Sequence, residues 1–212
     1  MDRSAEIAVI GDAARTALEQ KHAAREVMIA ASRRAIQACA ASIRATHRHE
    51  FAEAERLARE ARDHVAEADA ALDGQPDVRT NGPFADARKE LAEAWLTLAL
   101  VRDDPLPIPA DLGLDEAAYC NGLAEAASEL RRQLLDRLRA GDLARAETLM
   151  DAMDDVYSLL VTIDFPDGVT GGLRRTTDAL RAVLERTRGD LTTAMVAARL
   201  QGAIDAAAAG DR

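Results

Sequence analysis

Apolar residues recur at helical spacing along most of the chain, and prolines and glycines divide this pattern into segments. Residues 4–48 form the longest segment and contain no proline, and Ile29, Ile36 and Ile43 recur in it every seven residues. A seven-residue repeat returns to nearly the same face of an α-helix. The segment therefore predicts one long helix, with Ser4 as its cap and the isoleucines along a buried seam.

The same periodicity predicts six further helices. They cover residues 50–72, 84–101, 119–139 and 143–163, then a segment that starts at 164–166 and runs to 188, and finally 191–209. Gly189 followed by Asp190 favours a break between the last two, because glycine commonly ends a helix and aspartate commonly caps the next one. The prolines of residues 103–113 favour a surface connection.

The composition agrees with a helical fold. Hydrophobic residues make up 48% of the 212 residues and aromatic residues only 3%, which is typical of helices that pack through small side chains. We expect an all-α protein with one domain over residues 1–212. Cys39 and Cys120 are too few for a disulfide framework, so we expect both in the core. Residues 1–30 do not show a basic region followed by an apolar region, and the sequence contains no run of eighteen apolar residues, so we expect a soluble, cytoplasmic protein that does not contact membranes.

The net charge of −10 argues at first against a polyanionic partner. Within residues 13–49, however, seven basic residues stand against two acidic ones, so this segment carries a net charge of +5. Two explanations stay open: a solvated arginine face that supports solubility, or a surface that binds the phosphates of a nucleic acid. The candidate phosphate-binding residues are Arg25, Arg33, Arg44, His47 and Arg48.

Two pairs of glutamates fall on two of the predicted helices. Glu125 and Glu129 are four residues apart, so their side chains lie about 40° apart on one helical face. Glu90 and Glu93 are three residues apart on the earlier helix, and Gly122 leaves room for a second helix to approach Glu125. The two pairs are either parts of solvated faces or, if the helices meet, four carboxylates that bind a divalent metal ion.

Three segments carry a resemblance to a known family. Residues 163–192, IDFPDGVTGGLRRTTDALRAVLERTRGDLT, resemble the C-terminal signature of the translin and translin-associated factor X family, especially its prokaryotic members. Residues 32–61 resemble its N-terminal helices, and residues 118–157 its central region. The resemblance implies a seven-helix translin-like bundle that assembles, typically as a homo-octamer, into a hollow shell. It also implies binding of single-stranded RNA or DNA.

The resemblance assigns roles to the glutamates. The family pattern Gln-Glu-x-x-Glu-Ala falls on residues 89–94, with Lys89 in place of the glutamine and with Glu90 and Glu93 retained. The pattern Gly-x-Ala-Asp-x-x-x-Glu-Leu falls on residues 122–130, where Glu125 replaces the aspartate and Glu129 is retained. By resemblance, these four glutamates are the catalytic and metal-binding residues of an endoribonuclease that uses Mg²⁺ or Mn²⁺ to cleave single-stranded RNA.

Other functions remain as alternatives. The translin branch of the family lacks the acid at position 125, which makes a non-catalytic RNA- and DNA-binding shell the main alternative. A purely structural helical assembly is another. A carboxylate-bridged di-iron bundle would need two Glu-x-x-His units, and the chain has a single one, at residues 19–22.

Overall fold

The computed structural model describes residues 2–75, 78 and 82–210. Within these residues the chain forms eight helices and no strand, so the expectation of an all-α fold is confirmed. Their bounds are α1 Arg3–His47, α2 Phe51–Ala71, α3 Pro83–Arg102, α4 Pro109–Leu112, α5 Glu116–Arg139, α6 Leu143–Leu160, α7 Asp167–Thr170 and α8 Leu173–Gly210. Six of these helices are long, and α4 and α7 are single turns. Part of the connection between α2 and α3 lies outside the described residues.

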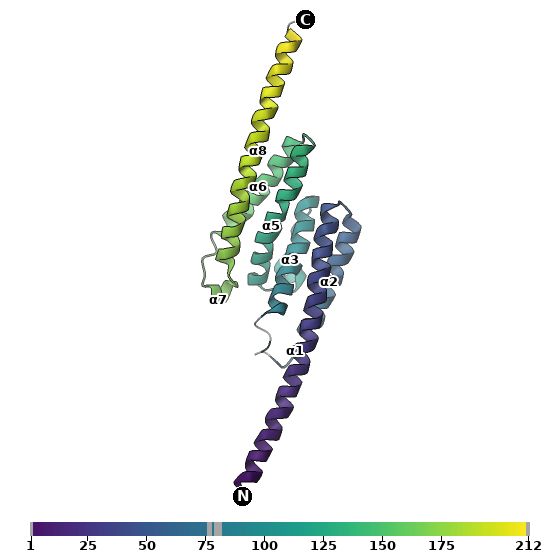
Figure 1. Cartoon of the computed structure of the whole chain (residues 1–212), viewed down its shortest axis with the longest axis vertical. Helices are drawn as coiled ribbons and strands as arrows, with labels where there is room; N and C mark the ends of the chain where they lie inside the picture. Colours follow the sequence, from purple (N-terminus) through teal and green to yellow (C-terminus); the bar gives the residue numbers. More distant parts are fainter. Residues whose placement is uncertain (1, 76–77, 79–81, 211–212) are drawn as a thin grey trace.

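The long helices run side by side along the long axis of the molecule (Figure 1). Helix α1 packs against α2 and α3, and α5 packs against α3, α6 and α8. The N-terminal half of α1 extends beyond this body at one end, and the C-terminal half of α8 extends beyond it at the other (Figure 1). No helix in the described part of the chain is long and apolar enough to cross a membrane.

Small residues line the buried side of α1. Ala31, Ala35 and Ala45 have no exposed surface, whereas Ile36 and Ile43 are only partly buried at the edge of the core. The predicted isoleucine seam is therefore displaced around the helix. The reason is that α2 and α3 approach α1 closely, and only small side chains fit on the line of closest contact.

Aspartates cap three of the long helices. Asp2 accepts a hydrogen bond from the Ser4 N–H at 3.1 Å, so Asp2 caps α1 in place of the predicted Ser4. Asp115 caps α5 through the Ala118 N–H at 2.8 Å, and Asp142 caps α6 in the same way. A side-chain oxygen at this position satisfies a backbone N–H that the helix itself leaves unpaired.

The predicted break at Gly189 and Asp190 is wrong, because α8 continues through both residues. Leu184 and Leu191 are buried in the same hydrophobic cluster on either side of this point, so a continuous helix keeps both in the core. Asp190 does not cap a helix; it pairs with Arg131 of α5 at 2.7 Å. The C-terminal part of the chain therefore holds one helix of 38 residues where the sequence predicted two helices.

The chain changes direction earlier, between α6 and α8. Helix α6 ends at Leu160, and α7 forms one turn before Gly171 and Gly172 adopt φ angles of 62° and 85°. Glycine adopts this left-handed conformation without the strain that a Cβ atom causes. These two glycines therefore set the start of α8.

Candidate active site

Helices α3 and α5 make an unusually close contact at Gly122. A Cβ atom on Gly122 would lie 2.4 Å from the Cβ of Ala92 and 2.7 Å from the carbonyl oxygen of Lys89. Since Gly122 has no side chain and Ala92 has only a methyl group, the two helices approach closely, and acids beside the contact on both helices come within reach of one another. The expectation that Gly122 admits another helix is confirmed.

Carboxylates from both helices gather beside this contact. Glu90 and Glu93 of α3 and Glu125 of α5 each place a carboxylate oxygen within 4.8 Å of the others. Glu129, one turn further along α5, lines the same open cavity of about 500 Å³. We call Glu90, Glu93, Glu125 and Glu129 the acidic cluster. The structure thus brings together all four acids that the sequence singled out.

Burial and mutual repulsion disfavour the charged form of these acids. Glu93 is 9% exposed, and its burial, followed by the charges of Glu90, Glu125 and Glu129, raises its pKa to about 9. Burial also raises the pKa of Glu90, although Lys89 opposes this rise. A carboxylate in such surroundings is stabilised by a proton or by a cation. The acids of the cluster therefore favour a proton or a cation beside them.

His47 supports the cluster from α1. Its imidazole is 7% exposed, and His47 Nε2 donates a hydrogen bond to Glu129 Oε2 at 2.6 Å. On its other side, His47 Nδ1 accepts from Gln133 Nε2 at 3.2 Å. Because an amide nitrogen only donates, this bond places the imidazole proton on Nε2. His47 is thus separate from the exposed arginines with which the sequence grouped it, and it orients Glu129.

Lys89 brings a positive charge into the cluster. Its Nζ lies 2.8 Å from Glu125 Oε1 and 3.9 Å from Glu90 Oε1. Burial lowers the pKa of Lys89, but the hydrogen bond to Glu125 and the charges of Glu125, Glu90 and Glu93 outweigh it, so the pKa is raised overall. The ammonium group therefore stays charged beside the acids. The sequence pattern did not identify this role, because it depends on the contact between α3 and α5.

The predicted arginines of α1, and Arg48 directly after this helix, are exposed. Arg25 pairs with Glu26 at 3.1 Å, and Arg48 pairs with Glu50 at 2.6 Å. Arg33 and Arg44 are exposed, and within the described residues neither makes an ion pair. Arg44 lines the cavity of the acidic cluster.

Arg132 of α5 lines the same cavity, although the sequence analysis did not single it out. It lies three residues after Glu129, so the helical period places the two on neighbouring positions of one face. Together with Arg44, it puts two cationic side chains around the opening above the acids.

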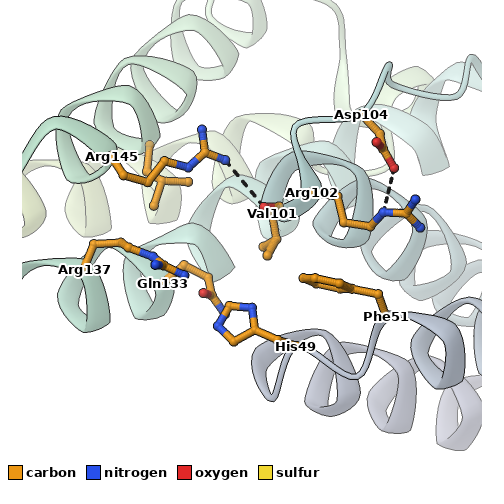
Figure 2. A pocket seen from close by; sticks show the side chains of 9 residues that line it. His49, Phe51, Val101, Arg102, Asp104, Gln133, Arg137 and Arg145 are labelled. Carbon is orange, nitrogen blue, oxygen red and sulfur yellow. Dashed lines mark hydrogen bonds and ion pairs between the residues drawn. The ribbon is translucent and has the colours of Figure 1, made fainter. Parts of the chain in front are cut away.

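Gln133 lines another cavity, of about 440 Å³ (Figure 2). Gln133 lines this cavity and also bonds to His47, so it links the two cavities. Arginines from three helices reach it, but Arg102 pairs with Asp104 at 2.7 Å, and Arg145 lies 3.5 Å from the carbonyl oxygen of Val101 (Figure 2). Protein groups, namely a carboxylate and a backbone carbonyl, thus already interact with two of the arginines that line this cavity.

The donor atoms of the acidic cluster fit a magnesium or manganese ion. Both ions prefer oxygen ligands, and the cluster offers carboxylate oxygens from two helices. Cys39 lies within electrostatic range of Glu90 and Glu93, but burial first, and then these two charges, raise the pKa of its thiol. Cys39 therefore stays a neutral core residue, as predicted, and does not add a sulfur ligand.

Comparison with known proteins finds close structural relatives. A structure of AfC3PO in complex with duplex RNA is 32% identical, covers 88% of this chain and 96% of its own, and superimposes with a TM-score of 0.81. A second structure of AfC3PO gives 32% identity, coverage of 88% and 97%, and a TM-score of 0.79. The structure of apo-NeC3PO, at 17% identity, covers 87% of this chain and 96% of its own with a TM-score of 0.75, and it shares the fold.

A relative is also found by sequence alone. An uncharacterized protein of Methanocaldococcus jannaschii is 29% identical over 181 residues, which are 83% of this chain and 78% of that protein. No family model matches the chain.

Proposed function

The chain belongs to the translin and translin-associated factor X family, and on this premise we propose that it binds RNA as a subunit of an oligomer. The similarity to AfC3PO supports this proposal, because that protein is described in complex with duplex RNA and matches most of this chain. The basic segment of α1 supports it from the residues themselves. In an acidic protein, exposed arginines gathered on one helix give a local surface to which phosphates are attracted.

The more specific proposal is a metal-dependent endoribonuclease that cleaves single-stranded RNA. The observation that carries it is the meeting of Glu90, Glu93 and Glu125 across the contact of α3 with α5, beside Glu129. These four acids would hold Mg²⁺ or Mn²⁺. The chemistry that such an ion supplies is a lowered pKa for a water molecule and neutralisation of the charge that develops on the scissile phosphate.

The protein's own residues would prepare this site in two ways. His47, held by Gln133, fixes the orientation of Glu129, as partners of ligating carboxylates commonly do. Arg44 and Arg132 at the cavity opening would hold phosphates of the RNA next to the acids. Arg33 lies on the same face of α1 as Arg44, since eleven residues return the helix to within about 20°. The proposed binding surface, which also includes Arg25 and Arg48, would therefore extend along α1.

The oligomer that we propose is a closed octamer of identical chains, with the arginines of α1 and the acidic cluster facing its interior. This arrangement would place the phosphate-binding residues on a concave surface and leave other acidic residues outside. It would also bring the cleavage site to single-stranded RNA or DNA that enters the shell. Light scattering of the purified protein would give the number of chains directly.

A non-catalytic RNA- and DNA-binding shell is the second candidate. The observation that favours it is the ion pair of Lys89 with Glu125, which already supplies a positive charge to the acids. For this candidate, RNA binding would persist in EDTA, and no cleavage would appear when Mn²⁺ is restored.

The test is cleavage of end-labelled single-stranded RNA, single-stranded DNA and duplex RNA in Mn²⁺, in Mg²⁺ and in EDTA. We expect metal-dependent cleavage of single-stranded RNA, and a loss of at least about 100-fold in the double variant Glu125→Gln, Glu129→Gln. Glu147→Gln removes one negative charge from an exposed position of α6 and serves as the control. Undiminished cleavage by the double variant, with binding intact, would remove these acids from the mechanism.

A further inference from the structure

Lys89 places a positive charge inside the acidic cluster. Its ammonium group contacts Glu125 of α5 and lies near Glu90 of its own helix, at 2.8 Å and 3.9 Å. The Lys89 side chain is 27% exposed, so surrounding protein shields it in part from water and counter-ions. The other lysine of the chain, Lys21, lies in the N-terminal half of α1.

The contacts divide the four acids into two groups. Lys89 forms ion pairs with Glu125 and Glu90, whereas no ion pair joins it to Glu93 or Glu129 in the described part of the chain. Glu129 uses one oxygen, Oε2, for the bond from His47. Lys89 contacts Oε1 of Glu125 and Oε1 of Glu90. The ligand atoms that remain available are those of the buried Glu93 carboxyl and the second oxygens of the other three acids.

Sites with two metal ions generally hold them about 3.5–4 Å apart, with carboxylates shared between them. A lysine ammonium carries one positive charge and makes hydrogen bonds of about the length seen here to carboxylate oxygens. We propose that Lys89 fills the place of a second cation, so that each chain binds one divalent ion and not two. The inference rests on the proposed metal site and goes beyond it, because it assigns the number of ions and the residue that sets it.

The consequence concerns this chain's own residues. A covalently attached cation cannot be removed by a chelator, so one positive charge always remains beside Glu125 and Glu90. The same charge opposes the binding of a second divalent ion next to the first. The site would therefore need a single ion from solution, and its saturation with Mn²⁺ would follow a one-site curve.

The experiment counts Mn²⁺ ions per chain on the purified full-length protein at fixed pH. Free Mn²⁺ is measured by electron paramagnetic resonance, and heats of binding by calorimetry. We expect one Mn²⁺ per chain for the unaltered protein, for Lys89→Arg and for the control Lys21→Gln, and two for Lys89→Gln. Two ions in the unaltered protein, or one ion in Lys89→Gln, would overturn the inference while leaving the metal site in place.

Thermal unfolding supplies a second measurement that does not depend on activity. In EDTA, Lys89→Gln should unfold at a lower temperature than the unaltered protein, because the acids lose the positive charge of Lys89. Addition of Mn²⁺ should raise the unfolding midpoint of Lys89→Gln by more than it raises the midpoint of the unaltered protein. Equal shifts in the two proteins would contradict the role of Lys89. Absence of Mn²⁺ binding in both proteins would instead reject the metal site itself, and with it this inference.

Discussion

Gly122 of α5 and Ala92 of α3 set the distance between the two helices that carry the acids. The Cβ of Ala92 fills the space that a side chain on Gly122 would need, since the two Cβ atoms would lie only 2.4 Å apart. Glu93 follows Ala92, and Glu125 lies three residues after Gly122, so the same contact places both acids. The geometry of the acidic cluster therefore depends on the packing of these two small residues.

Gly122→Ala should destabilise the protein and disturb the site together. The added methyl would meet backbone atoms of Lys89 and Glu93 as well as Ala92, so the helices must separate. Overpacking of this kind typically lowers the free energy of unfolding by about 1–3 kcal/mol. We expect a lower midpoint in thermal unfolding and weaker Mn²⁺ binding than in the unaltered protein.

Gly189→Ala is the matched control for this change. Gly189 lies inside α8, and a Cβ atom there would meet no atom within 4 Å. Alanine in a helix interior is favoured over glycine by about 0.5–1 kcal/mol, so this variant should be slightly more stable than the unaltered protein. If the two variants changed stability by the same amount and in the same direction, the close contact at Gly122 would not explain the effect.

The sequence predicted the helices better than their partners. Periodic apolar positions gave the helix that carries Glu90 and the helix that carries Glu125, because this signal is local. The two acid pairs meet only because α3 packs against α5. A single sequence does not reveal which helices pack against each other. Small residues around Gly122 indicated a close contact, and the structure identified α3 as the partner.

The features that the sequence did not predict have physical causes that lie outside the local pattern. Gly189 and Asp190 predicted a helix end, but burial of Leu184 and Leu191 outweighs the weak preferences of glycine and aspartate. His47 was grouped with exposed arginines because it shares their helix. Its burial against α5 appears only when tertiary contacts are known.

Glu93→Gln should stabilise the metal-free protein at neutral and alkaline pH. The pKa of Glu93 is raised from 4.5 to about 9, so its protonated form is favoured by folding. Its contribution is fully present below about pH 4.5 and is lost as the pH rises toward 9. Glutamine does not titrate and keeps a neutral side chain throughout this window.

The measurement is urea unfolding in EDTA at several pH values. At pH 8 we expect Glu93→Gln to exceed the unaltered protein by at least about 1 kcal/mol, because each unit of pKa shift corresponds to about 1.4 kcal/mol. The difference should shrink as the pH falls to 4.5. A constant difference at all pH values would show that packing, and not the charge of Glu93, causes it.

His47→Ala should weaken metal binding without touching a proposed ligand. The substitution removes the hydrogen bond that holds Glu129 Oε2 and leaves Gln133 without its partner. Loss of a residue that orients a ligand typically lowers metal affinity by about 10–100-fold. The matched control is His22→Ala, an exposed histidine on the extended half of α1. Equal Mn²⁺ affinity in both variants would contradict the positioning role of His47.

The double variant Arg33→Gln, Arg44→Gln tests whether α1 binds phosphates. Each phosphate contact on single-stranded nucleic acid contributes about 0.7 to the slope of log affinity against log salt concentration, so the slope should fall by about 0.7 for each arginine. Affinity should fall similarly for RNAs of different sequence, because phosphates carry no sequence information. Arg34→Gln is the control, since Arg34 already pairs with Glu67 at 2.6 Å. An unchanged slope in the double variant, or an equal decrease in the control, would mean that the acidic cluster receives RNA from another surface.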